Sequence, residues 1–218
     1  MSSTDLREKC QSIIDACLRM NQLGINQGTS GNISLRHGAG LLITPTSVPY
    51  EAMQPEQIVF MNLDGSFDPR QRPSSEWRFH LDILKARPEV NAVVHAHPPY
   101  STMLAIMGLE IPPVHYMIAC AGGDTIRCAP YATYGTEELA GNAVRALRDR
   151  TGCLLGNHGA VTVGQDLATA HDKGVYLEWL CDVYLRAAAA GTPRLLSAAE
   201  IAAVAARLAG YGQSPPVA

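Results

Sequence analysis

Apolar residues recur at steps of three and four in several stretches of the chain, which is the spacing of helices with one buried face. The first stretch begins at Thr4, a residue suited to capping free backbone N–H groups, and ends near Leu23. The same pattern predicts a short helix after Pro98. Four further helices are expected at approximately residues 76–86, 136–150, 166–190 and 197–209.

Shorter apolar runs bounded by glycine, proline or asparagine predict strands instead. ISLR and LLIT flank the turn HGAG as a predicted hairpin, and QIVFMNLDGS leads into a turn. Strands are also expected in NAVVHAH and on both sides of the turn in CLLGNHGAVTVG, whereas residues 111–136 are rich in Gly and Pro and predict strands and loops. Because helices and strands alternate irregularly, the sequence favours an α/β fold of three layers. A central mixed, mostly antiparallel sheet would be covered by helices on both faces.

Composition limits the domain organisation and the environment. With 218 residues, 47% of them hydrophobic, the chain suits one domain over residues 1–218, with 213–218 as a flexible tail. A net charge of −3 gives no basic surface for nucleic acid, and the apolar stretches are too short to span a membrane. The first residues do not resemble a secretory signal, so we expect a cytoplasmic protein. The six cysteines lack the spacing of metal or redox motifs, which favours reduced thiols.

The segment VVHAHPPY places His95 and His97 two positions apart on a predicted strand. Residues two apart share a strand face and lie about 6.5–7 Å apart along it, so both imidazoles can reach one ion. A catalytic zinc site takes three protein ligands, and His158 is the candidate third because glycines bracket it at a sharp turn. Ordinary hydrogen-bonded histidines are the alternative, which the spacing alone does not exclude. The remaining histidines are interpreted as structural: His37, His80, His115 and His171.

A carboxylate, Glu76, stands at a predicted helix start behind Ser74 and Ser75. Free N–H groups there favour negative charge, so the position suits either a carboxylate that complements the helix dipole or a bound phosphate. The loops GTSGN and TPTS offer similar amides and hydroxyls, and three such loops suggest a phosphorylated substrate. The three lysines lie on polar helix faces and are poor Schiff-base candidates, so carbonyl chemistry would need a metal as electrophile.

Several long segments resemble the class II aldolase/adducin family, in order, from about Asp5 to Gly212. They are GTSGNISLR, LLITPTSVPYE, PSSEWRFHLDILKARPEVNAVVHAH, VHYMIACAGGDTIRCAPYATYGT and LLGNHGA. The likeness is greatest to the family's aldolases. It implies the class II aldolase fold, a homotetramer around a fourfold axis, and metal sites at subunit interfaces that hold Zn²⁺, with Mn²⁺ or Co²⁺ as other options.

The resemblance also implies roles for individual residues. Glu76 would act as the base, Tyr116 would exchange a proton with the aldehyde oxygen from a neighbouring subunit, and Tyr211 would close over the substrate. Four residues would bind the metal: Glu76, His95, His97 and His158. Seven would form the site for the substrate phosphate: Gly28, Thr29, Asn32, Thr46, Ser47, Ser74 and Ser75.

The implied reaction is reversible cleavage of a ketose 1-phosphate, L-fuculose 1-phosphate or a close analogue, into dihydroxyacetone phosphate and an aldehyde such as L-lactaldehyde. Breaking the C3–C4 bond leaves an enediolate, whose charge a divalent cation stabilises. Three residues depart from the aldolase pattern: Ser47 replaces glycine, Asn157 replaces histidine and Tyr134 replaces phenylalanine. Because of these departures, the resemblance identifies the aldehyde half of the substrate less well than the phosphate half.

Three alternatives stay open at this point. A sibling enzyme of the same fold would be a pentulose 5-phosphate 4-epimerase, a methylthioribulose 1-phosphate dehydratase or a 5-deoxypentulose 1-phosphate aldolase. A non-enzymatic, adducin-like interaction domain would need neither the three histidines nor the glutamate, so their presence disfavours it. A non-haem iron enzyme would use two histidines and a carboxylate.

Overall fold

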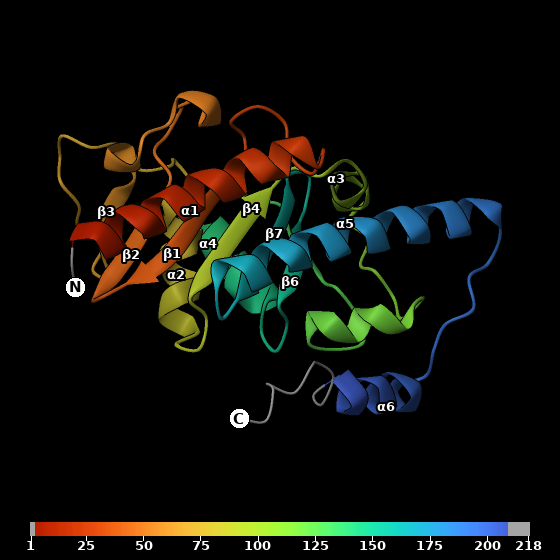
Figure 1. Cartoon of the computed structure of the whole chain (residues 1–218). Helices are drawn as coiled ribbons and strands as arrows, with labels where there is room; N and C mark the ends of the chain where they lie inside the picture. The colour runs from red at the N-terminus through yellow and green to blue at the C-terminus, as the bar shows by residue number, and fades with distance from the viewer. Residues whose placement is uncertain (1–2, 209–218) are drawn as a thin grey trace, which may run out of the picture.

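A seven-stranded sheet runs through the middle of the protein in the computed structural model, which describes residues 3–208 (Figure 1). The strand order is β3-β2-β1-β4-β7-β6-β5, and every neighbouring pair is antiparallel except β5 and β6. The strands are β1 (Asn32–His37), β2 (Gly40–Ile43), β3 (Val59–Asn62), β4 (Ala92–Ala96), β5 (Cys128–Ala129), β6 (Gly152–Leu155) and β7 (Gly159–Gly164). The prediction of a mixed, mostly antiparallel sheet is therefore confirmed.

Helices cover both faces of this sheet, as the three-layer prediction requires. α1 (Ser3–Gln22) and α5 (Leu167–Ala190) cross the face that is in front in Figure 1, and α2 (Trp77–Ala86) and α4 (Glu137–Ala146) pack behind it. Side chains of a strand alternate between the two faces. In β4, Val94 joins the apolar core beneath α1, whereas Val93 joins the core shared with α2 and α4. His95 consequently points to the α2 side, where its ring meets that of Phe79.

A third apolar core lies beside the sheet, between α3 (Pro99–Ile106), α5, α6 (Ala198–Leu208) and the 3₁₀ helix η3 (Tyr116–Ala121). Two further 3₁₀ helices are short: η1 (Tyr50–Ala52) and η2 (Pro55–Gln57). None of the helices between residues 3 and 208 combines the length and apolar character needed to cross a bilayer.

Local chemistry explains where the helices begin and end. The Thr136 hydroxyl accepts a hydrogen bond from the Leu139 N–H at 3.2 Å and so caps the start of α4. The helix η3 differs from the expectation of strands and loops in this region. His115 Nδ1 accepts from the Met117 N–H at 3.2 Å, and Gly122 ends the turn with φ +91°. A glycine-rich segment thus still forms helical turns when one side chain caps them.

Candidate active site

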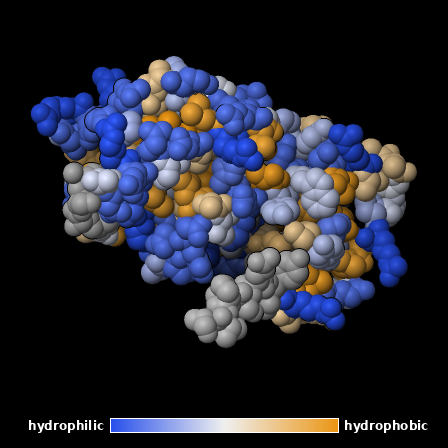
Figure 2. Space-filling model, in the orientation of Figure 1, coloured by the Kyte–Doolittle hydropathy of each residue, from blue (hydrophilic) through white to orange (hydrophobic). Residues whose placement is uncertain are grey.

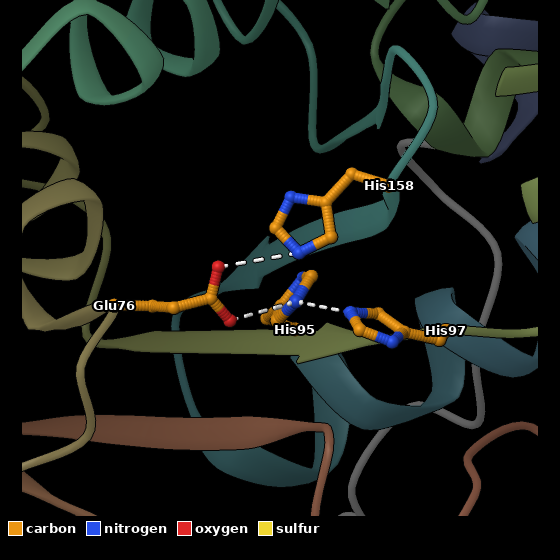
Figure 3. Close-up of side chains that lie close together, drawn as sticks. All are labelled: Glu76, His95, His97 and His158. Carbon is orange, nitrogen blue, oxygen red and sulfur yellow. Dashed lines mark hydrogen bonds and ion pairs between the residues drawn. The ribbon is translucent and has the colours of Figure 1, made fainter. Parts of the chain in front are cut away.

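Four side chains from three parts of the chain meet at one end of β4 (Figure 3). Glu76 directly precedes α2, His95 lies on β4, His97 follows that strand, and His158 lies in the turn between β6 and β7. Their potential ligand atoms all lie within 4.8 Å of one another. The antiparallel pairing of β4 with β7 brings the β6–β7 turn to the end of β4. We call these four residues the histidine cluster.

The atoms at the centre of the cluster are close enough to share one ion. His95 Nε2 is 3.1 Å from His97 Nε2 and 3.1 Å from Glu76 Oε2, and His158 Nε2 is 3.2 Å from Glu76 Oε1. The three rings stand edge to face, with centroids 4.8–4.9 Å apart. Three imidazoles and one carboxylate are ligand types that zinc and related divalent metals prefer.

The hydrogen bonds around the cluster test whether a cation fits there. His95 Nδ1 lies 2.9 Å from the Ala160 carbonyl oxygen, which can only accept, so Nδ1 donates and the lone pair of a neutral ring is on Nε2. That lone pair faces the Glu76 carboxylate, which is also an acceptor. Glu76 Oε1 is buried and accepts no hydrogen bond. A divalent cation between these atoms satisfies all of them, so the residues fit a metal.

The protonation of the cluster agrees with metal binding. Burial, and after it the neighbouring imidazoles, lower the pKa of His97 to about 4, and burial and His95 lower the pKa of His158 to about 4. Burial alone would raise the pKa of Glu76, but the imidazoles of His95 and His158 and the Asn32 amide hold it below its usual range. At neutral pH His97 and His158 therefore offer neutral imidazoles, and Glu76 offers a carboxylate anion.

An open hollow of about 340 Å³ leads to the cluster from the surface. Its walls include Ser30 and Ser75 from the predicted phosphate loops, together with Tyr131, Tyr134 and Asn157. The structure thus brings a serine from a predicted phosphate loop and the histidine cluster into the same hollow. Tyr134 and Asn157, two of the departures from the family pattern, lie on its wall.

Two of the predicted phosphate loops run side by side. Thr46 N–H donates to the Arg72 carbonyl at 3.1 Å, Ser74 N–H donates to the Thr44 carbonyl at 2.9 Å, and an isolated β-bridge pairs Pro45 with Pro73. A second hollow of about 280 Å³ is lined by Thr46, Arg72 and Ser75, among others. Its cationic wall was missed by the sequence analysis. An arginine next to predicted phosphate ligands is the signal that could have found it.

The glycine-rich loop approaches the cluster closely. A Cβ atom on Gly31 would lie 2.7 Å from the His95 carbonyl oxygen, so only glycine lets the loop lie against this strand. The turn begins at Gly28, with φ +57°, and Thr29 follows it on the exposed side. Asn32, the last residue of the loop motif, is buried, and its amide nitrogen donates to Glu76 Oε2 at 2.9 Å. Here Asn32 contacts the predicted base.

Left-handed backbone conformations occur at two of the positions that depart from the family pattern. Ser47 has φ +59° and Asn157 has φ +53°, two of only three non-glycine residues with positive φ in the described part of the chain. Asn tolerates this conformation, whereas serine is strained in it. The glycine expected at position 47 from the family pattern would relieve that strain.

Tyr116, the predicted proton-exchanging residue, does not line this hollow. Tyr116 lies on η3 with 49% of its surface exposed, and its ring centroid is 4.7 Å from that of His115, which also meets Trp179 of α5. It is not among the described residues that line the hollow. Tyr211 lies outside the described residues. The structure therefore brings together the predicted metal ligands but not Tyr116.

Comparisons with known proteins agree with this geometry. The family model "Class II Aldolase and Adducin N-terminal domain" matches residues 11–185. A 5-methylthioribulose-1-phosphate/5-deoxyribulose-1-phosphate aldolase of Rhodospirillum rubrum is 44% identical over 209 residues, covering 94% of this chain and 95% of its own. An L-fuculose phosphate aldolase of Escherichia coli is 45% identical over 203 residues, covering 93% and 94%.

The fold comparison gives the same result. A solved structure of an L-fuculose 1-phosphate aldolase superposes with a TM-score of 0.90 at 34% sequence identity, covering 96% of this chain and 98% of the other. The matched family model, the extent of these relatives and the cluster of three histidines and a glutamate agree: the chain belongs to the class II aldolase and adducin family and is a metal-dependent aldolase of that family.

Proposed function

We propose that the protein reversibly cleaves a ketose 1-phosphate, L-fuculose 1-phosphate or a close analogue, to dihydroxyacetone phosphate and an aldehyde, with Zn²⁺ in the histidine cluster. The observation that supports this most is the cluster itself, which shares its hollow with Ser75 of a predicted phosphate loop. The loops would bind the phosphate and leave the carbon skeleton beside the metal. Mn²⁺ and Co²⁺ are the other candidate ions, because imidazole and carboxylate ligands suit several divalent metals.

The residues of the chain would handle the protons of this reaction. A divalent cation bound to the cluster would supply positive charge near the oxygens on which negative charge develops. When the C3–C4 bond breaks, the C4 hydroxyl loses its proton, which Tyr116 would accept as the aldehyde forms. Glu76 would take up a proton from solvent and deliver it to C3 of the enediolate, which completes dihydroxyacetone phosphate, while Tyr116 would release its proton to solvent. In the reverse direction each proton returns along the same path.

The oligomeric arrangement is part of this proposal. Tyr116 is exposed on η3, outside the hollow, so it can serve the reaction only at a neighbouring subunit or after a large movement. Large apolar residues are also exposed on nearby elements: Ile106, Met107, Tyr176 and Trp179. Figure 2 shows apolar atoms at the end of the molecule where α3, the later part of α5 and α6 lie. These features support active sites at subunit interfaces, and the homotetramer that we propose is the assembly implied by the family resemblance.

A second substrate is favoured by one specific observation. The Rhodospirillum rubrum relative, 44% identical to this chain, is named for 5-methylthioribulose 1-phosphate and 5-deoxyribulose 1-phosphate. These compounds and L-fuculose 1-phosphate share the phosphorylated end and differ in the aldehyde they release. A role outside fucose metabolism would follow if this chain prefers the pentulose substrates.

The experiment is a coupled assay for dihydroxyacetone phosphate with L-fuculose 1-phosphate, 5-deoxyribulose 1-phosphate and 5-methylthioribulose 1-phosphate. We expect cleavage to stop after chelation and to return with Zn²⁺, and the ratio of kcat/KM values to identify the substrate. A pentulose 5-phosphate serves as a further arm. Epimerisation of that sugar at C4 without cleavage of any ketose 1-phosphate would contradict the proposal.

Three properties of the whole protein complete the proposal. We expect residues 1–218 to fold as one domain and the enzyme to work in the cytoplasm on a phosphorylated sugar. Residues 213–218, the expected flexible tail, lie outside the described residues.

A further inference from the structure

A row of buried polar side chains continues the cluster into the protein interior. Behind Glu76, the Asn32 amide nitrogen is 2.9 Å from Glu76 Oε2, and Asn32 Oδ1 is 2.6 Å from His80 Nε2. His80 Nδ1 is in turn 2.8 Å from Ser34 Oγ. Asn32 and Ser34 are 4% and 0% exposed, and His80 is 0% exposed. The sequence analysis interpreted His80 as structural, but this row connects it to the predicted base.

The direction of every hydrogen bond in the row is determined. Glu76 is a carboxylate and can only accept, so the Asn32 NH₂ group faces it and Oδ1 faces His80. Oδ1 also can only accept, so His80 Nε2 carries the proton. His80 is neutral, because burial lowers its pKa to about 3, and its Nδ1 must therefore accept from the Ser34 hydroxyl. No donor is opposite a donor anywhere in the row.

The fold explains why these residues meet. Asn32 and Ser34 are two apart on β1 and share one face, and Asn32 is the register partner of His95 on β4. Glu76 and His80 are four apart at the start of α2, which places them one above the other on one side of that helix. β1 and α2 therefore hold the row between them, beside the metal-binding strand.

We propose that His80 is a positioning residue. With Ser34 behind it, it holds the Asn32 amide with the N–H group toward Glu76 and keeps the Glu76 carboxylate aimed into the cluster. Without the His80 proton, the Asn32 amide can turn and place its oxygen against the carboxylate, which repels it. This inference rests on the proposed function, because it assigns His80 to the orientation of a metal-binding base.

The test compares His80→Phe with His80→Gln in the full-length protein. Phenylalanine fills the space of the ring but donates no hydrogen bond, whereas a glutamine amide places an N–H group near the position of Nε2. We expect His80→Phe to lower kcat about 10–100-fold and to weaken Zn²⁺ binding, measured by chelator competition. It also changes the visible absorption spectrum of the Co²⁺-substituted protein. In the His80→Gln variant, we expect kcat, Zn²⁺ binding and the cobalt spectrum to return most of the way to their wild-type values.

A matched control separates positioning from stability. His171 on α5 is also a mostly buried histidine, 7% exposed, and lies outside the cluster and its hollow. His171→Phe should shift the thermal midpoint and leave the cobalt spectrum and kcat unchanged. The inference is wrong if His80→Phe keeps the wild-type spectrum and rate, or if His80→Gln is as impaired as His80→Phe. Wild-type protein that takes up no Co²⁺ or Zn²⁺ would instead contradict the proposed function.

Discussion

The histidine cluster and the region around Tyr116 differ in how much of their surroundings one chain provides. The cluster is enclosed: His95 is 0% and Glu76 5% exposed, and β1, β4 and the β6–β7 turn all contribute contacts to it. Tyr116, in contrast, is 49% exposed on η3 beside His115. One folded chain can thus assemble a metal site completely, whereas the proposed proton transfer at the aldehyde oxygen depends on a surface that a second copy would complete.

The largest expected effect comes from removing a ligand of the enclosed histidine cluster. His95→Ala deletes a central ligand, so we expect metal loss and a decrease in kcat greater than the about 10–100-fold typical of residues that only orient ligands. Metal content by elemental analysis and the cleavage assay measure both. A variant that keeps stoichiometric zinc and turns over normally would exclude His95 as a ligand.

The next prediction separates the two proposed roles of Glu76, as a base and as a metal ligand. Glu76→Gln keeps the shape and the hydrogen bond from Asn32 but removes the charge, so we expect retained, weakened metal binding and about a 10²–10⁴-fold loss of kcat. The loss is one of proton transfer and should appear in kcat more than in KM. Comparable turnover in the glutamine variant would remove Glu76 from the role of base.

The proposed role of the exposed Tyr116 at a neighbouring subunit is tested by complementation between two variants. Tyr116→Phe should lower kcat by about 10²-fold or more, because it removes the hydroxyl that exchanges a proton with the aldehyde oxygen, while leaving metal content unchanged. Oligomers that combine Tyr116→Phe and His95→Ala subunits contain interfaces with one intact copy of each residue, so we expect them to regain activity. Failure of mixed oligomers to regain any activity would place both residues in the same subunit's site.

The stability of the metal-free protein should depend on pH because of the buried His80. Burial lowers the pKa of folded His80 from 6.5 to about 3, so between these values the unfolded chain binds a proton that the folded chain does not. The free energy of unfolding then decreases as pH falls below 6.5, by about 2 kcal/mol between pH 7 and pH 5 for this group. Urea unfolding at both pH values measures it.

Two variants provide the controls for this pH effect. His80→Phe should reduce the decrease, because the titrating group is gone, and Tyr116→Phe should leave it unchanged. An unaltered pH dependence in His80→Phe would show that other groups cause the effect. The lowered pKa values of His97 and His158 act in the same direction, so part of the decrease should remain.

The smallest expected effect concerns the backbone of the TPTS loop. Ser47 has φ +59°, a conformation that costs a non-glycine residue roughly 1–2 kcal/mol, part of which the flexibility of an unfolded glycine offsets. Ser47→Gly should therefore raise the free energy of unfolding by roughly 0.5–1 kcal/mol, measured by urea titration. Ser47→Ala is the matched control, because it removes the hydroxyl and keeps the strain. Equal stability of both variants would mean that the hydroxyl matters more than the backbone.

Local sequence patterns predicted most helices and strands, but they predicted fewer of the contacts between segments that are distant in the sequence. The spacing of His95 and His97 placed them on one strand face, and the strand pairing brought them together with His158 as expected. His80 was assigned no role because its partner Asn32 is 48 residues away, and no local period shows that β1 would lie opposite α2. The helix η3 was missed because composition alone favoured loops, although His115 caps its first turn.

The strand that carries His95 occupies the middle of the sheet, with β1 on one side and β7 on the other. Backbone hydrogen bonds on both sides make β4 one of the segments that should open least often, so its amide protons should exchange with deuterium among the slowest in the chain. A bound ion would then leave by stepwise release of its ligands and not through local unfolding. The emptied site would keep its shape and could be reloaded without refolding.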